Sequence, residues 1–218
     1  MFIVEKKPKS ISTEAYKSLR TNIQYSSFDD EYKTIVVTSS EPGEGKSTIS
    51  GNLALVLAQG ESNVLLIDCD MRKPTLHKKF AISNTSGLSD LLQCKSKMNL
   101  EKISYKYNNN LTIITSGKIP PNPSEMLASK AMSNFLEEMK SKFDYIILDT
   151  PPIHAVTDSQ ILARKVDGVL LVVRANKTKK DLVNNSINSI KNIKANFIGV
   201  VLNGVDISDN KYYQYYGE

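Results

Sequence analysis

The chain has 218 residues, of which 40% are hydrophobic and 23% are charged, as is ordinary for a globular protein. Its net charge of +5 comes without a dense basic block or interleaved aromatic residues, so nucleic-acid binding is not favoured. The longest apolar run, GVLLVV at 168–173, is too short to cross a bilayer. We therefore expect one cytoplasmic α/β domain at 1–207, followed by a short tail at 208–218.

A helix is predicted first, over residues 12–27, with Thr13 as its cap. Its apolar stripe consists of Ala15, Leu19 and Ile23. Three charged residues recur along a neighbouring face: Glu14, Lys17 and Arg20. That face is either simply solvated or a contact surface.

Short β-branched runs then alternate with helical stretches, a pattern typical of βαβ units and a mostly parallel sheet. The predicted strands are 34–39, 63–68, 111–116, 144–149, 168–173 and 197–203. The predicted helices are 46–59, parts of 75–103, 124–141, 158–165 and 178–192, with Ser124 as a cap. Strands that read as continuous apolar runs are covered on both faces, so helices should flank the sheet.

The segment SSEPGEGKSTIS at 39–50 lies between a predicted strand and a predicted helix. It follows the phosphate-loop pattern G-x-x-x-x-G-K-[ST], except that Ser40 replaces the first glycine. Lys46 would reach the β- and γ-phosphates, and the Ser47 hydroxyl would bind Mg²⁺. The predicted nucleotide-binding residues of the loop are Glu41, Pro42, Gly43, Glu44, Gly45, Lys46, Ser47 and Thr48.

Acidic residues follow two later strands. Asp68 and Asp70 lie in VLLIDCDMRKP, and Asp149 follows the apolar run of YIILDTPP. Open α/β sheets place ligands at the carboxyl ends of their strands, and Mg²⁺ takes one or two carboxylates together with phosphate oxygens. We therefore expect Ser47, Asp68 and Asp149 to hold Mg²⁺ beside bound ATP.

Taken together, these motifs resemble the bacterial tyrosine kinases of capsule and exopolysaccharide synthesis, within the MinD/ParA-like P-loop ATPases. The matching segments are EAYKSLRTNI, EPGEGKST, LLIDCDMRKP, GLSDLL, SGKIPPNPSEML, YIILDTPP, VVRANKT, VVLNGVD and the tyrosine-rich end KYYQYYGE. Two positions depart from the related patterns. Glu41 stands where the partitioning ATPases carry a lysine, which favours the kinase branch, and Lys17 stands where the kinases usually carry an arginine.

The resemblance implies an ATP- and Mg²⁺-dependent kinase that phosphorylates its own tail. Its phosphoacceptors would be Tyr212, Tyr213, Tyr215 and Tyr216. The catalytic residues would be Lys46, Asp68, Asp70 and Asp149. Asp68, or less favourably Asp70, would accept the phenolic proton. Two other readings stay open: a MinD/ParA-like ATPase switch, or a nucleotide-binding scaffold without kinase activity.

The resemblance also implies partners. Glu14, Lys17 and Arg20 would contact a neighbouring subunit in a ring formed by the unphosphorylated chain. A membrane-spanning polysaccharide co-polymerase would activate the kinase through its cytoplasmic tail and recruit it to the inner face of the membrane. Arg72 would bind phosphate or a neighbouring subunit. Asn203 and Arg174 would contact the nucleotide or merely end their strands.

Overall fold

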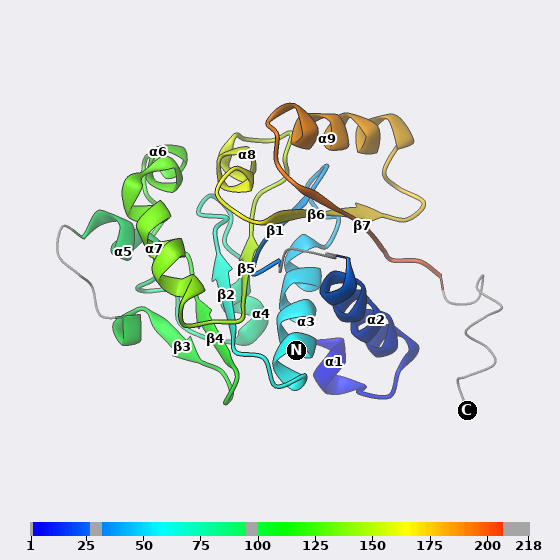
Figure 1. Cartoon of the computed structure of the whole chain (residues 1–218), viewed down its shortest axis with the longest axis horizontal. Helices are drawn as coiled ribbons and strands as arrows, with labels where there is room; N and C mark the ends of the chain where they lie inside the picture. Colours follow the sequence, from blue (N-terminus) through cyan, green and yellow to red (C-terminus); the bar gives the residue numbers. More distant parts are fainter. Residues whose placement is uncertain (1, 27–31, 95–99, 207–218) are drawn as a thin grey trace.

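The computed structural model describes residues 2–26, 32–94 and 100–206. The four tail tyrosines and residue 27, the last of the predicted first helix, lie outside these ranges. Within the described residues, seven strands form one sheet in the order β3-β4-β2-β5-β1-β6-β7 (Figure 1). Every neighbouring pair is parallel except β3 and β4, which are antiparallel at one edge. The predicted mostly parallel α/β fold is confirmed.

The strands are β1 (Thr34–Ser39), β2 (Val64–Asp68), β3 (Ser104–Lys106), β4 (Leu111–Ile114), β5 (Tyr145–Asp149), β6 (Gly168–Arg174) and β7 (Phe197–Asn203). The helices are α1 (Ile3–Lys6), α2 (Ile11–Tyr25), α3 (Lys46–Gln59), α4 (Leu76–Phe80), α5 (Leu88–Gln93), α6 (Pro123–Ala128), α7 (Lys130–Lys140), α8 (Asp158–Ala163) and α9 (Lys180–Asn192). A 3₁₀ turn, η1, spans Leu100–Lys102.

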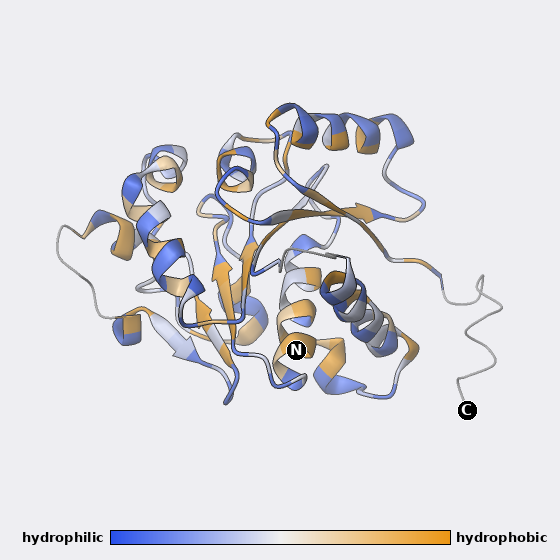
Figure 2. Cartoon of the chain, in the orientation of Figure 1, coloured by the Kyte–Doolittle hydropathy of each residue, from blue (hydrophilic) through white to orange (hydrophobic). Residues whose placement is uncertain are grey.

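Helices cover both faces of the sheet, as its uninterrupted apolar strands require. One core cluster joins the sheet to α1, α2, α3 and α4, and the other joins it to α5, α6, α7, α8 and α9. Figure 2 shows hydrophobic strands between helices whose outward faces are hydrophilic. Among the described helices, none has both the length and the apolar composition needed to span a membrane.

Two short elements were not predicted. β3 is three residues long and half-exposed, so it carries no hydrophobic period of its own. α1 has a single turn, yet its Val4 is fully buried and the amide of Val4 donates to Asn52 Oδ1 at 3.2 Å. α1 depends on a partner distant in sequence, and β3 depends on its pairing with β4, and a local hydrophobic period reveals neither.

Both predicted helix caps are wrong. Ser10, not Thr13, caps α2, because the Ser10 hydroxyl accepts the Thr13 amide at 3.3 Å. Ser124 lies inside α6, which starts at Pro123, and its hydroxyl donates to Asp158 instead. The predicted helix 124–141 is also divided at Ser129, whose side chain accepts the Met132 amide and caps α7.

Candidate active site

The phosphate loop joins β1 to α3 at the carboxyl edge of the sheet. Gly43 and Gly45 have φ angles of +84° and +96°, a left-handed conformation that favours glycine. Because α3 follows directly on Gly45, no capping side chain stands between a ligand and the first amides of the helix. The loop therefore offers the cradle of backbone donors that binds phosphate in such folds.

Glu44 holds this loop rather than facing a ligand. Its buried carboxylate accepts the Glu41 amide at 2.9 Å and the hydroxyl of Thr178 from the loop after β6. Its backbone carbonyl accepts Nδ2 of Asn203 at 2.8 Å. Asn203, expected to contact the nucleotide or end its strand, thus supports the loop from the end of β7. Arg174, at the end of β6, lies beside Gly204.

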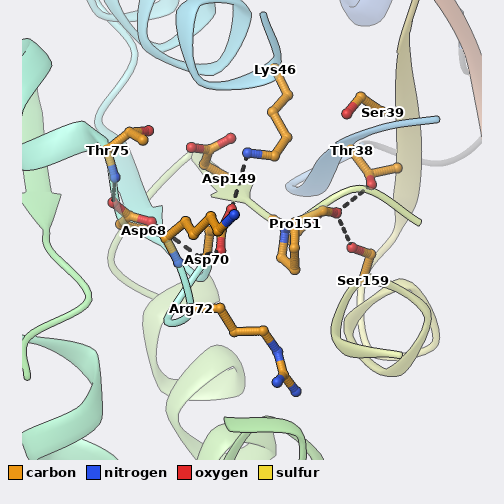
Figure 3. A network of polar contacts seen from close by, with 12 residues as sticks. Thr38, Ser39, Lys46, Asp68, Asp70, Arg72, Thr75, Asp149, Pro151 and Ser159 are labelled. Carbon is orange, nitrogen blue, oxygen red and sulfur yellow. Dashed lines mark hydrogen bonds and ion pairs between the residues drawn. The ribbon is translucent and has the colours of Figure 1, made fainter. Parts of the chain in front are cut away.

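Lys46 points from the start of α3 into the acidic cluster (Figure 3). Its Nζ atom lies 3.1 Å from Oδ2 of Asp70, while Oδ1 of Asp70 accepts the Lys73 amide at 3.0 Å. Burial by itself lowers the pKa of the Lys46 ammonium, but the charges of Asp149 and Asp70 outweigh burial and raise it. Lys46 is therefore a fixed positive charge beside the phosphate loop.

Asp68 and Asp149 end neighbouring strands in register, and both are fully buried. Oδ2 of Asp68 accepts the amides of Thr75 and Leu76, each at 3.0 Å, so the residues that begin α4 fix its orientation. Oδ1 of Asp149 accepts the hydroxyl of Ser50 at 3.1 Å, a residue that the sequence did not single out. The position of Ser50, one turn after Lys46 on α3, is the sequence signal that could have identified this residue.

Burial raises the pKa of both carboxyls, and the charge of Asp149 adds to the effect on Asp68. The positive charge of Lys46 and the hydroxyls of Ser47 and Ser50 partly offset the shift at Asp149. When both carboxyls are ionised, the cluster carries more negative charge than its own residues neutralise, so a bound cation would stabilise the ionised form.

Mg²⁺ fits these residues. The Oδ2 atom of Asp149 is buried and has no hydrogen-bond partner within the described residues. No group of three or more His, Cys, Asp or Glu side chains in that part of the chain is arranged to hold a metal alone. Mg²⁺ needs no such group, because it keeps several waters and shares phosphate oxygens with one or two carboxylates.

Arg72 is held within the chain. Its Nε and Nη2 atoms donate to the two carboxylate oxygens of Asp158 at 2.9 and 3.1 Å, and Ser124 donates to the same carboxylate at 2.6 Å. Nearby, the Pro151 carbonyl accepts the hydroxyls of Thr38 and Ser159, which fixes the loop after Asp149 (Figure 3). Asp158 resembles any acid in a first helical turn, so its sequence position did not reveal this role.

The three predicted subunit-contact residues lie on α2, away from the acidic cluster. Lys17 pairs with Glu14 at 2.7 Å, and Nη1 of Arg20 donates to the Val56 carbonyl of α3 at 2.8 Å. Part of the donor capacity of Arg20 is therefore used inside the chain. The contact with another subunit stays a prediction.

Residues 32–201 match the family model described as an AAA domain. The chain is 43% identical to the tyrosine-protein kinase YwqD of Bacillus subtilis over 210 residues, covering 96% of this chain and 88% of that protein. The kinase domain of the Escherichia coli tyrosine kinase ETK is a similar solved structure, with a TM-score of 0.89, 34% identity and coverage of 94% and 80%. The chimerical protein CapA2B2 has a TM-score of 0.87 and 38% identity, with coverage of 92% and 88%.

Proposed function

The chain belongs to the AAA-domain family and, within it, to the bacterial tyrosine-protein kinases, and on this basis we propose that it transfers the γ-phosphoryl group of ATP to tyrosines of its own C-terminal tail. The observation that carries the proposal is the convergence of Lys46, Asp70, Asp68 and Asp149 beside the phosphate loop. A tyrosine placed there would lie beside both the Lys46 ammonium, which can bind phosphate, and the three carboxylates.

In this proposal the tasks are divided among the residues of the site, and Asp68 has two of them. The loop amides and Lys46 hold the phosphates, so Lys46 exchanges its Asp70 partner for the nucleotide. Ser47, Asp149 and Asp68 hold Mg²⁺, which when bound neutralises charge on the phosphates. Asp68, with Asp70 as the alternative, takes the proton of the attacking phenol, which is a poor nucleophile at neutral pH because its pKa is near 10.

The acceptors proposed are Tyr212, Tyr213, Tyr215 and Tyr216, which lie outside the described residues. The test is incubation of the purified chain with Mg²⁺ and ATP, followed by mass mapping of phosphotyrosine. A variant with all four tyrosines changed to Phe should bind nucleotide but lose most of the incorporated phosphate. Hydrolysis of ATP without phosphotyrosine would favour an ATPase switch, and binding without turnover would favour a scaffold.

We also propose that the unphosphorylated chain forms a ring through Glu14, Lys17 and Arg20, with the tail of one subunit reaching the site of the next. Four phosphotyrosines would add roughly −6 to −8 of charge at neutral pH, which opposes assembly. Light scattering should therefore report a smaller particle after full phosphorylation. An unchanged mass would contradict the ring.

The proposed setting is the synthesis and export of capsular or exopolysaccharide. The E. coli protein etk is much longer than this chain, which spans 28% of it. We propose that a separate membrane-spanning co-polymerase activates this kinase with its cytoplasmic tail and recruits it to the inner membrane face. Adding that tail should increase phosphotyrosine formation. An unchanged rate would contradict the activation.

A further inference from the structure

A lysine outside the recognised motifs reaches the phosphate loop from α4. Nζ of Lys79 donates to the Thr48 hydroxyl at 2.9 Å. Thr48 follows Lys46 and Ser47 directly on the first turn of α3. The same short helix begins with the amides that hold Asp68. α4 therefore connects the acidic cluster and the phosphate loop.

Thr48 faces a different part of the site from its two predecessors. Successive residues on a helix are rotated by about 100°, so Thr48 cannot share the direction of Ser47. Lys46 points to the acidic cluster and Ser47 is buried beside Asp149, whereas Thr48 is half-buried. In the proposed function Lys46 takes the terminal phosphates, which leaves the phosphate nearer the ribose as the partner for the Thr48 hydroxyl.

The pairing also prepares the Thr48 hydroxyl to donate. An ammonium group has donors and no acceptor, so the threonine oxygen must accept from Lys79. The hydroxyl then has its own proton to give, and the adjacent positive charge strengthens that donation. Together the Lys79 ammonium and the Thr48 hydroxyl are suited to bind a phosphate oxygen, which is a negatively charged acceptor.

Space for a ligand adjoins the pair. A cavity of about 250 Å³ is lined by Phe2, Ile3, Lys6, Thr48, Asn52 and Lys79. Its charged lining residues are the two lysines, so the cavity is positive. Its wall is fixed, because Asn52 binds the Val4 amide and donates to the Thr48 carbonyl. The Phe2 ring fills the space beside Gly51, where a Cβ would lie 2.2 Å from it.

We propose that Lys79 is a further nucleotide-binding residue, which acts with Thr48 on the ribose-proximal phosphate, while Lys6 adds positive charge from the same cavity. The inference rests on the proposed function in that the ligand is a nucleotide. It adds a contact from α4, outside the phosphate loop itself. A phosphate present in both ADP and ATP is the target.

The test compares ADP and ATP binding to the full chain in Mg²⁺ by calorimetric titration. Lys79→Met should weaken both nucleotides by the same factor, about tenfold, or about 1.4 kcal/mol. The neighbouring exposed Lys78→Met is the matched control and should bind like the wild type. Lys79→Arg keeps the charge and should recover most of the affinity, which guards against a variant that fails to fold.

Thr48→Val and the Lys79→Met/Thr48→Val double variant complete a cycle. If the lysine acts with the hydroxyl, the double variant binds no more weakly than the weaker single variant. Unchanged ADP affinity in Lys79→Met, a loss confined to ATP, or multiplicative losses in the double variant would each overturn the inference. Nucleotide affinity is measured without phosphoryl transfer, so a chain that binds ADP through Lys79 but never phosphorylates tyrosine would overturn the proposed function alone.

Discussion

Arg72 and Asp158 form a two-pronged ion pair that joins the segment after β2 to the start of α8. Asp158 is fully buried, whereas 39% of the Arg72 side chain is exposed. Ser124 of α6 completes the junction by binding both partners. The junction fixes the loop that carries Asp70 relative to the loop that follows Asp149.

Replacing Arg72 with Lys should destabilise the chain, because an ammonium cannot engage both carboxylate oxygens in the planar fork. We expect the free energy of unfolding to fall by about 1–2 kcal/mol, since a buried carboxylate loses part of its hydrogen bonding. Urea denaturation measures the change. The exposed neighbour Lys73→Gln is the control and should stay within about 0.5 kcal/mol of the wild type. Equal stability of Arg72→Lys and the control would contradict this role for the junction.

Replacing Lys46 with Met should abolish phosphorylation of the tail. The variant removes the cation that Asp70 holds beside the phosphate loop, and a methionine offers a phosphate no charge or donor. Phosphotyrosine mapping after incubation with Mg²⁺ and ATP measures the effect, while circular dichroism checks the fold. Lys118→Met, at an exposed loop position, should phosphorylate normally. Autophosphorylation retained by Lys46→Met would refute the assignment.

Asp167 should make stability depend on pH. Burial by itself raises the pKa of its carboxyl, but hydrogen bonds from Thr34 and the ion pair with Lys140 at 3.1 Å outweigh burial and lower it. A pKa lower in the folded state than in the unfolded state stabilises the chain above the unfolded value, about 4 for Asp. That stabilisation is lost as the pH falls through the folded value.

Asp167→Asn should therefore lower the free energy of unfolding at neutral pH by about 1 kcal/mol. The difference from the wild type should shrink below about pH 4. Denaturant titrations at several pH values measure it. Glu137→Gln, whose side chain is 72% exposed, should show little effect at any pH. A difference that grows as the pH falls would contradict the sign.

The sequence predicted what continuous runs and local motifs encode. The six parallel strands are apolar runs, and Lys46, Ser47, Asp68 and Asp149 fall in patterns whose spacing follows from phosphate and metal chemistry. What it missed depends on tertiary partners. The sequence placed Glu44 among the nucleotide-binding residues and left Asn203 open between a nucleotide contact and a strand end, and their contact with each other appears only when the fold brings β7 beside the phosphate loop. Lys79 likewise reads as one of two adjacent lysines within a predicted helical stretch.

Gly45 should tolerate no side chain, for two separable reasons. Its φ of +96° strains any residue with a Cβ, and a Cβ there would lie 2.1 Å from Nδ2 of Asn203. Gly43 shares the positive φ, at +84°, but a Cβ there would meet nothing within 4 Å. Gly43→Ala therefore isolates the backbone strain, about 1–2 kcal/mol.

Gly45→Ala should lose more stability and more ADP affinity than Gly43→Ala. The new Cβ would displace the side-chain amide of Asn203, which donates to the Glu44 carbonyl and so supports the loop. Adding Asn203→Ala should remove the clash and recover part of the loss in Gly45→Ala, while the same addition to Gly43→Ala should recover nothing. Thermal unfolding and ADP titration of the four variants measure both effects. If Asn203→Ala worsens Gly45→Ala as much as it worsens Gly43→Ala, the steric part of the explanation is wrong and backbone strain alone limits this position.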